Sequence, residues 1–596
     1  MAKSIPHSYQ VVVEKGLPAM MRDGVTLYAD VYRPEAAGRF PVLVMRLPYN
    51  KDLFGLDVER GFGHYFAHRG YMVVMQDTRG RFSSEGDFYP LIHEAEDGYD
   101  TIEWAAQLPW GDGRVGTVGQ SYYGATQYLL APTRPPHLVA CAPISAPSDW
   151  WESWIYHSGG VFELGWLITY TIGMAADTAR RLGRMERLHE LLPYFGVGEE
   201  SAVAFEEAIR MPLSQEAYRK LPVSAWGEIL ADIAPFFRYY LSHPDDGPYW
   251  WQLNLRQKHH LMTVPMYHIG SWYDIFLEGT IQHYLGLREQ AATPEARAAQ
   301  KMIIAPWPHL GRPRPYTDPH TEAGEADFGP EAAIELQDLT LRWFDYWLKG
   351  VQNGIMEEPP VTVFVMGDNV WRQEEEWPPA RARYTPYYLH SGSGANTLSG
   401  DGVLSPVPPV DEPPDHYTYD PEDPTPTRGG NNLVIPAGVY DQRPVETRPD
   451  VLVYTSDVLT QDLEVTGPLA AKLFAASSAP DTDFAAKLVD VRPDGYAHNV
   501  QDGILRTRYR FSKTHPSPLK PGEVYEFTID LWATSYVFKA GHRLRLEVAS
   551  ANFPRFDRNL NVREHPLLAT QGQPAQQTVF HDASRPSHIL LPVIPR

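Results

Sequence analysis

The chain has a single cysteine, Cys141, among its 596 residues. One thiol cannot form a disulfide within the chain, and it cannot supply the several thiolates of a structural zinc site. With no second cysteine as a redox partner, we expect Cys141 to be a small, buried hydrophobic residue.

Basic residues are scarce relative to acidic ones, with 52 Lys and Arg against 74 Asp and Glu and a formal net charge of −22. The net negative charge repels polyanions and removes the main attraction for a phosphate backbone, so we expect no nucleic-acid partner. No stretch approaches the roughly 18 consecutive apolar residues of a membrane span, and residues 1–10 contain no apolar run of signal-peptide length. We therefore expect a cytoplasmic protein with no membrane partner.

Strands and helices are predicted to alternate in the first part of the chain. Residues 11–32 alternate in polarity around a turn at Gly24, which predicts an antiparallel hairpin at a sheet edge. Continuous apolar runs at 42–45 and 71–75 are typical of strands buried on both faces of a parallel sheet. The same reasoning predicts helices at 95–108 and 336–348, the latter ending at Gly350, and strands at 138–144, 264–269 and 302–305.

Two regions depart from this alternation. Residues 148–243 have a helical pattern, with Leu182, Met185, Leu188 and Leu192 spaced three or four apart, and we interpret them as an inserted cap. After Gly350, short strands such as 361–365, 470–475 and 544–549, divided by turns rich in Pro, Gly and Asp, predict an all-β sandwich. We interpret the proline- and acid-rich segment 405–430 as a long surface excursion of that sandwich. The predicted domains are the first part of the core (1–147), the cap (148–243), the second part of the core (244–354) and the β-sandwich (355–596).

Ser121 follows a predicted strand and precedes a predicted helix, in the sequence RVGTVGQSYYG of residues 114–124. Gly119 and Gly124 remove the side chains that would collide in a turn tight enough to thrust a serine outward as a nucleophile. The second glycine falls one place later than in the commonest G-x-S-x-G elbow, so an ordinary strand-to-helix turn is an equal alternative on this motif alone.

A serine hydroxyl needs a base to remove its proton and a carboxylate to orient that base. Asp274 and His309 each come just after a predicted buried strand, in the order Ser, Asp, His that α/β hydrolases use. One histidine among 22 would usually be a surface or core residue, but three candidates in this order at strand ends favour a catalytic triad.

These motifs resemble those of the cocaine esterase and X-prolyl dipeptidyl-peptidase family of serine hydrolases, which also includes α-amino acid ester hydrolases. The resemblance covers nearly the whole chain and is most specific in QDTRGRFSSEG (76–86), PWGDGRVGTVGQSYYG (109–124), GSWYD (270–274) and RWFDYWLKG (342–350). In that family the second glycine of the elbow stands at the later position, as Gly124 does here. The resemblance implies an α/β-hydrolase core with a mixed, mostly parallel sheet, an inserted helical cap and a C-terminal jelly-roll β-sandwich.

By the same resemblance Ser121 is the nucleophile, His309 the base and Asp274 the acid that orients it, with no metal and no cofactor. The oxyanion would be bound by the backbone N–H of Tyr122 and by the hydroxyl of Tyr49, which stands just beyond an early strand as the family's tyrosine does. The alternative for Tyr49 is simple packing beside the strand end.

Three aromatic residues are candidates for the substrate pocket. Trp154 and Trp166 resemble the family's cap tryptophans that line the acyl pocket, and Phe276 follows the acid Asp274. Such aromatic residues are often only core. The charged loop from Asp77 to Gly86 is interpreted as structural, because guanidinium groups and carboxylates set so close together more often brace a loop than do chemistry.

The triad does not distinguish among family activities. Exopeptidases and amino-acid ester hydrolases must hold a free ammonium, which needs carboxylates, and residues 122–125 after the serine have none; Glu278 is left as a candidate anchor. We therefore favour hydrolysis of a small carboxylic ester, with X-Pro dipeptidyl-peptidase or α-amino acid ester hydrolase (acylase) activity as the alternatives. An inactive hydrolase scaffold that serves as a binding module is an alternative of another class. The oligomeric state stays open, with a homodimer among the options.

Overall fold

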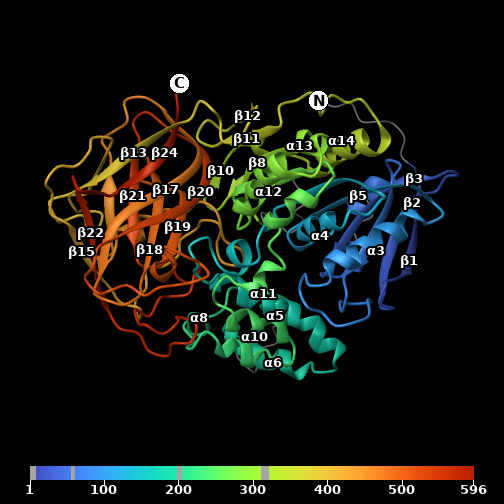
Figure 1. Ribbon diagram of the computed structural model, residues 1–596, viewed down its shortest axis with the longest axis horizontal. Coiled ribbons are helices and arrows are strands. Elements are labelled where there is room, and N and C mark those ends of the chain that lie inside the picture. The colour runs from blue at the N-terminus through green and yellow to red at the C-terminus, as the bar shows by residue number, and fades with distance from the viewer. Residues whose placement is uncertain (1–8, 55–60, 198–204, 310–320, 596) are drawn as a thin grey trace.

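The computed structural model describes residues 9–54, 61–197, 205–309 and 321–595. Its centre is a ten-stranded sheet with the strand order β1-β2-β4-β3-β5-β6-β7-β8-β11-β12 (Figure 1). The strands from β4 to β11 in that order run parallel, and the two ends of the sheet are antiparallel. The strands are β1 (Val11–Met20), β2 (Thr26–Pro34), β3 (Phe40–Leu47), β4 (Met72–Asp77), β5 (Gly111–Gln120), β6 (Leu138–Ile144), β7 (Tyr267–Tyr273), β8 (Lys301–Pro308), β11 (Val361–Val365) and β12 (Val370–Glu374).

Both faces of this sheet are covered, as the continuous apolar runs predicted. Val42 and Val44 of β3 enter one hydrophobic cluster, and the intervening Leu43 and Met45 enter another. Helices α3 (Glu94–Ala106) and α4 (Tyr122–Leu130) contribute to the first cluster, and α2 (Phe62–Ala67) and α14 (Leu336–Lys349) to the second. The helix α14 ends at Gly350 with φ 72°, as expected for a helix stopped by a left-handed glycine. Cys141 is buried in the first cluster, which confirms its predicted role.

One strand lies in a different sheet from the one predicted. Residues 361–365 were assigned to the β-sandwich, but β11 pairs in parallel with β8 and forms a hairpin with β12, so both strands extend the core sheet. That assignment is wrong, because a short apolar strand pattern does not record which sheet the strand joins.

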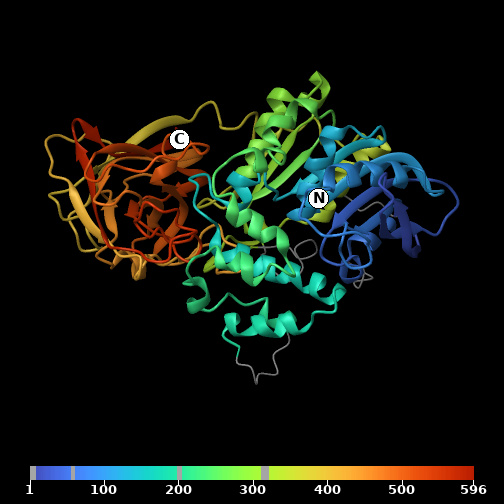
Figure 2. The same ribbon diagram turned by 60° about the horizontal axis from the view of Figure 1, so that its bottom comes forward.

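The cap is made of one long helix, α5 (Leu164–Arg181), and several short ones, which lie below the core and the β-domain in Figure 1 and come forward in Figure 2. It begins with a single π-helical turn, η2 (Trp151–Ile155). The remaining helices are α6 (Glu186–Leu191), η3 (Leu192–Phe195), α7 (Phe205–Ala208), α8 (Gln215–Tyr218), α9 (Ala225–Ile229), α10 (Pro235–Ser242) and α11 (Pro248–Trp251).

The apolar spacing from Leu182 to Leu192 does not correspond to one helix. The chain leaves α5 at Leu182 and turns at Gly183, whose φ is 68°, before α6 begins. Leu182 and Met185 are therefore exposed, while Leu188 and Leu192 are buried. A left-handed glycine ends a helix whatever the polarity pattern around it.

The C-terminal domain is a twelve-stranded, almost wholly antiparallel sheet folded into a β-sandwich, at the left of Figure 1. Residues 470–475 and 544–549 are strands as predicted. The segment 405–430 is not simply a surface excursion, since β15 pairs with β22 and Asp415 is fully buried. The strands are β13 (Arg383–His390), β14 (Val403–Ser405), β15 (Asp415–Tyr419), β16 (Leu452–Thr455), β17 (Leu463–Ser477), β18 (Asp483–Val491), β19 (Ala497–Arg506), β20 (Tyr525–Phe538), β21 (Arg543–Ala549), β22 (Ala575–Asp582), β23 (Arg585–Pro586) and β24 (His588–Ile594).

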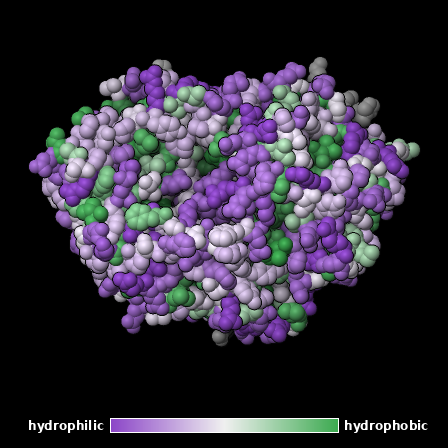
Figure 3. All heavy atoms as spheres, in the orientation of Figure 1, coloured by the Kyte–Doolittle hydropathy of each residue, from purple (hydrophilic) through white to green (hydrophobic). Residues whose placement is uncertain are grey.

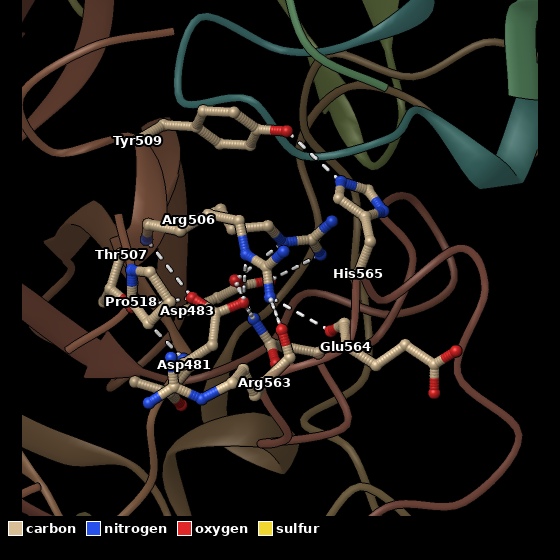
Figure 4. A network of polar contacts seen from close by, with 12 residues as sticks. Asp481, Asp483, Arg506, Thr507, Tyr509, Pro518, Arg563, Glu564 and His565 are labelled. Carbon is tan, nitrogen blue, oxygen red and sulfur yellow. Dashed lines mark hydrogen bonds and ion pairs between the residues drawn. The ribbon is translucent and has the colours of Figure 1, made fainter. Parts of the chain in front are cut away.

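A polar network surrounds the buried Arg506 of this domain (Figure 4), and one of the carboxylates bound to Arg506 also bonds to the cap. Arg506, at the end of β19, donates to both carboxylate oxygens of Asp483, at 3.0 and 2.9 Å, and to Asp557 at 3.0 Å. The same oxygen of Asp557 accepts the backbone N–H of Phe162 in the cap, at 2.9 Å. The β-domain therefore holds the cap segment between η2 and α5.

Shorter elements complete the described chain. They are α1 (Lys51–Phe54), η1 (Ala131–Thr133), η4 (Arg256–Leu261), α12 (Leu277–Gln290), α13 (Pro294–Ala298), β9 (Glu322–Ala323), β10 (Ala326–Asp327), η5 (Pro330–Ala332), α15 (Arg443–Glu446) and η6 (Thr507–Tyr509). None of the helices in the described ranges has the length and apolar composition needed to cross a membrane. On the face drawn in Figure 3, hydrophobic residues occur in small groups separated by hydrophilic ones.

Candidate active site

Ser121 stands between β5 and α4 in a strained backbone conformation. Its φ of 59° and ψ of −126° lie outside the regions that non-glycine residues ordinarily occupy. Its backbone N–H donates to the carbonyls of Ile144 and Ser145, at 2.9 and 3.1 Å, which fixes the turn to the end of β6. Strain of this kind at one serine is typical of a nucleophile elbow.

The two glycines of the turn are required by close contacts. A Cβ at Gly119 would lie 2.3 Å from the Tyr123 ring, and φ there is 151°. A Cβ at Gly124 would lie 2.8 Å from the carbonyl oxygen of Ile144. The later position of the second glycine is therefore the one that lets α4 pack against β6.

Asp274 and His309 form a buried hydrogen-bonded pair. Asp274 follows β7, His309 follows β8, and the Nδ1 of His309 lies 2.9 Å from Oδ2 of Asp274. The other oxygen, Oδ1, accepts the backbone N–H of Phe276 at 2.7 Å. With Nδ1–H donated to the carboxylate, the imidazole is held in the tautomer whose Nε2 is a free base.

Ser121 and His309 line the same cavity, of about 440 Å³. The side chain of Gln120, next to the serine, donates to the carbonyl of His309 at 2.7 Å and so ties the two loops together. The structure thus brings the three predicted triad residues to one site from the ends of β5, β7 and β8, three strands of the same sheet with β6 between β5 and β7.

Tyr49 and Tyr122 flank the serine. The Tyr49 hydroxyl lies 3.3 Å from that of Tyr170 and interacts with Ser121; burial raises its pKa to about 12, although both hydrogen bonds counteract the rise. Tyr49 therefore remains a protonated donor at neutral pH. The side chain of Tyr122 points away from the cavity, and its hydroxyl donates to Glu94 at 2.8 Å. The backbone N–H of Tyr122 is the first of α4, so it has no acceptor within the helix and can donate to a ligand.

The predicted pocket aromatics meet at one wall of the cavity. The Trp154 ring stacks on that of Phe276, with centroids 5.2 Å apart, and contacts Trp166 edge-on at 5.6 Å. Phe276 in turn lies edge-on to His309, at 5.2 Å. All three line the cavity. Trp154 belongs to the π-helical turn η2, an element that is frequent at functional sites.

The C-terminal domain also reaches the cavity, which the sequence did not reveal. Leu433 and Val434 line it, and Val434 has φ 74°, a strained value for a β-branched residue. Nearby, the side-chain amide of Asn431 donates to the carbonyls of Trp272 and Asp274, at 2.8 and 2.9 Å. A loop of the β-domain therefore supports the strand end that carries Asp274.

The loop from Asp77 to Gly86 is mainly a structural brace, as interpreted. Arg79 donates to Asp97 at 2.9 and 2.6 Å, and Asp77 accepts the hydroxyl of Ser83 at 2.7 Å. Arg81 differs, because its side chain lines the cavity. The sequence showed a charged loop but no signal for which charge turns inward.

Glu278, the candidate ammonium anchor, is not among the residues that line the cavity. Its Oε1 accepts the side-chain amide of Gln282 at 2.7 Å, and burial raises its pKa well above the usual carboxyl range. Among the described residues that line the cavity there is no Asp and no Glu. The described lining therefore offers no carboxylate to an ammonium group.

Two family models match the chain and together cover most of it. Residues 23–311 match the X-Pro dipeptidyl-peptidase (S15 family) model, and residues 353–590 match that of the X-Pro dipeptidyl-peptidase C-terminal non-catalytic domain. A cocaine esterase from Rhodococcus sp. (strain MB1 Bresler) is 37% identical over 591 residues, 97% of each chain.

Solved structures resemble the whole chain. An aminopeptidase from the marine sediment archaeon Thaumarchaeota archaeon has a TM-score of 0.82 at 25% identity, covering 100% of this chain and 98% of its own. An α-amino acid ester hydrolase has a TM-score of 0.81 at 24% identity, with the same coverage, and shares the fold. The predicted architecture, an α/β-hydrolase core with a cap and a C-terminal β-sandwich, is confirmed.

Proposed function

This chain belongs to the family of serine hydrolases that includes cocaine esterase and the X-Pro dipeptidyl-peptidases, and from that premise we propose that it cleaves small carboxylic esters through an acyl-enzyme on Ser121. Family membership makes it a hydrolase that acts on esters. The observation that carries the residue assignment is the Asp274–His309 pair beside a strained serine at the same cavity.

In the acylation step, Nε2 of His309 takes the proton of Ser121 while Oγ attacks the ester carbonyl carbon. Negative charge then develops on the carbonyl oxygen, where the Tyr49 hydroxyl and the Tyr122 backbone N–H donate to it. His309 returns the proton to the departing alkoxide, the carbon–oxygen bond breaks, and the acyl group stays on Ser121.

In the deacylation step, water replaces the alcohol. His309 takes a proton from water, the hydroxide adds to the acyl carbon, and the same two donors bind the second oxyanion. Collapse of this intermediate releases the carboxylic acid and returns the proton to Ser121 Oγ. Asp274 stabilises the imidazolium in both steps without itself accepting the proton. All of these steps use groups of this chain and call for no cofactor or second macromolecule.

An ester is favoured over an X-Pro peptide or an amino-acid ester because of the charge in the cavity. A dipeptidyl-peptidase must hold a free ammonium, and a partly buried ammonium needs a carboxylate partner. The described lining of the cavity supplies none and places the Arg81 cation there instead. Its apolar walls, formed by residues such as Trp154, Trp166 and Phe276, suit the aromatic or aliphatic part of an ester.

The test is a substrate panel made up of p-nitrophenyl butyrate, Ala-Pro p-nitroanilide and ampicillin. We expect the neutral ester to have the highest kcat/KM. Faster cleavage of Ala-Pro p-nitroanilide would instead establish a dipeptidyl-peptidase. A fluorophosphonate probe should label Ser121 in the parent and not in Ser121→Ala; failure to label the parent would favour an inactive scaffold that binds rather than cleaves.

A further inference from the structure

Arg81 is the only Arg, Lys, Asp or Glu among the described residues that line the cavity. It is 2% exposed, so the guanidinium is almost wholly withdrawn from bulk solvent. Phe82 and Phe88 lie around it, with ring centroids 5.1 and 4.7 Å from Cζ. A cation in so apolar a setting interacts strongly with any anion that enters.

Two of the three guanidinium nitrogens are occupied by backbone acceptors. Nε–H donates to the carbonyl of Pro48 at 2.9 Å, and Nη1–H donates to that of Met174 at 2.7 Å. Nη2 donates to no residue in the described part of the chain. Its two N–H groups are therefore available to a ligand in the cavity.

The charge of Arg81 is only partly compensated. The carboxylate paired with it is that of Asp177, whose Oδ2 lies 3.8 Å from Nη1, too far for a hydrogen bond. The same oxygen accepts the backbone N–H of Phe82 at 2.8 Å, and Oδ1 lies 4.0 Å from Arg180. Burial lowers the pKa of Arg81 from its ordinary value, yet an arginine in a protein keeps its proton.

We propose that Arg81 is a specificity-determining residue that binds a carboxylate carried by the ester substrate, through Nη2, within the same cavity that holds Ser121. This inference rests on the proposed function and deepens it by naming a substrate class: esters in which either the acid or the alcohol part bears a carboxylate. Guanidinium–carboxylate hydrogen bonds away from water are strong and directional, whereas an ammonium would be repelled. The position of Arg81 also links recognition to catalysis, since its Nε holds the residue before Tyr49.

The experiment compares matched ester pairs that differ in one charge. The first pair is p-nitrophenyl hydrogen glutarate and its methyl ester, which places the carboxylate in the acid part. The second is 4-carboxyphenyl acetate and phenyl acetate, which places it in the alcohol part. In at least one pair, Arg81→Met should lower kcat/KM for the charged ester on the order of ten- to a hundred-fold more than for the neutral one. Arg81→Lys, which keeps the charge, should recover part of that loss.

Arg181→Met is the matched control. Arg181 braces the same loop by donating to the carbonyls of Phe82, Ser84 and Gly86, at 3.0, 2.6 and 3.2 Å, but it does not line the cavity. Loosening the loop in this way should change kcat/KM for the charged and the neutral ester of each pair by the same factor.

Equal loss on charged and neutral esters in Arg81→Met would overturn the proposal and make Arg81 a brace for Pro48 and Met174. If Arg81→Met loses all turnover, ligand binding is measured by calorimetry in the Ser121→Ala background. Adding Arg81→Met to that variant should weaken the binding of monomethyl glutarate at least tenfold and leave the binding of dimethyl glutarate unchanged. Unchanged binding of both would again overturn it. If the parent hydrolyses none of the four esters, the proposed function itself fails, and this assignment falls with it.

Discussion

Two arginines of this chain, Arg81 at the catalytic cavity and Arg506 in the β-domain, are equally buried, at 2% and 0% exposure, and are used differently. Arg506 makes two hydrogen bonds to the carboxylate of Asp483 (Figure 4) and a third to that of Asp557. Arg81 donates to two backbone carbonyls and, within the part of the chain that the structure describes, to no carboxylate.

The difference indicates how buried charge can be sorted into structural and functional roles. Where a cation is surrounded by its own anions, its removal leaves unpaired carboxylates, so the damage is to folding. Where a cation borders a cavity and has N–H donors that bind no protein acceptor, its removal changes what the cavity binds.

The largest expected effect is at Ser121. Ser121→Ala removes the nucleophile and keeps the Cβ, so kcat on p-nitrophenyl butyrate should fall by about 10⁴- to 10⁶-fold while the melting temperature stays unchanged. Steady-state kinetics with a parallel thermal melt make the check. Activity within tenfold of the parent would remove Ser121 from the mechanism.

Arg506→Met should show the opposite pattern. Asp483 and Asp557 would be left buried without their cation, which costs about 3–5 kcal/mol of unfolding free energy. Urea denaturation measures this loss, and kcat on the same ester, taken well below the melting temperature, should stay within about tenfold of the parent. A variant of unchanged stability would contradict the structural role assigned to the network.

Tyr49→Phe should lower kcat by roughly 10²- to 10³-fold with KM nearly unchanged, because it deletes one donor to the developing oxyanion and keeps the ring. The pKa of about 12 keeps the hydroxyl protonated, so the ratio of parent to variant should be constant from about pH 7 to pH 10. Tyr170→Phe removes the neighbouring hydroxyl and serves as the control. A Tyr49→Phe rate within threefold of the parent would leave Tyr49 with packing alone.

The sequence was most informative where the signal is local. The apolar runs at β3 and β4, the helix stop at Gly350 and the glycines around Ser121 each depend on a few neighbouring residues, and the structure contains all of these features as predicted. The triad candidates were likewise found from strand ends and chain order, which the α/β topology brings to one edge.

Long-range placement could not be predicted in the same way. Asn431 lies 157 positions from Asp274, and nothing in its neighbourhood indicates that it supports the end of β7. Val434 reaches the cavity because a loop of the β-domain folds over the core, and β11 joins β8 through parallel pairing that its five residues do not encode. The inward turn of Arg81 depends on Pro48 and Met174, which come from separate elements.

The smallest predicted effect concerns Glu163, at the junction of the cap and the β-domain, a buried acid with no hydrogen-bonded cation among the described residues. Burial raises the pKa of Glu163 to about 7, against 4.5 ordinarily, although Arg555 at 3.9 Å opposes the rise. A carboxyl with a raised folded pKa contributes stability below its unfolded pKa and loses that contribution as the pH rises through the folded value. The parent should therefore lose stability relative to Glu163→Gln between about pH 4.5 and pH 7, by at most about 3 kcal/mol.

Urea denaturation of both proteins at pH 5 and pH 8 measures the change in their difference. Glu186→Gln, on the exposed start of α6, is the control and should show no such change. Because Glu163 does not line the cavity, the pH effect should appear in the stability and leave the ester kinetics of the folded enzyme unchanged. The difference in unfolding free energy between the parent and Glu163→Gln could instead stay constant from pH 5 to pH 8. Arg555 would then hold Glu163 ionised throughout, and Glu163 would belong with the paired buried charges, such as Asp483 and Asp557 beside Arg506.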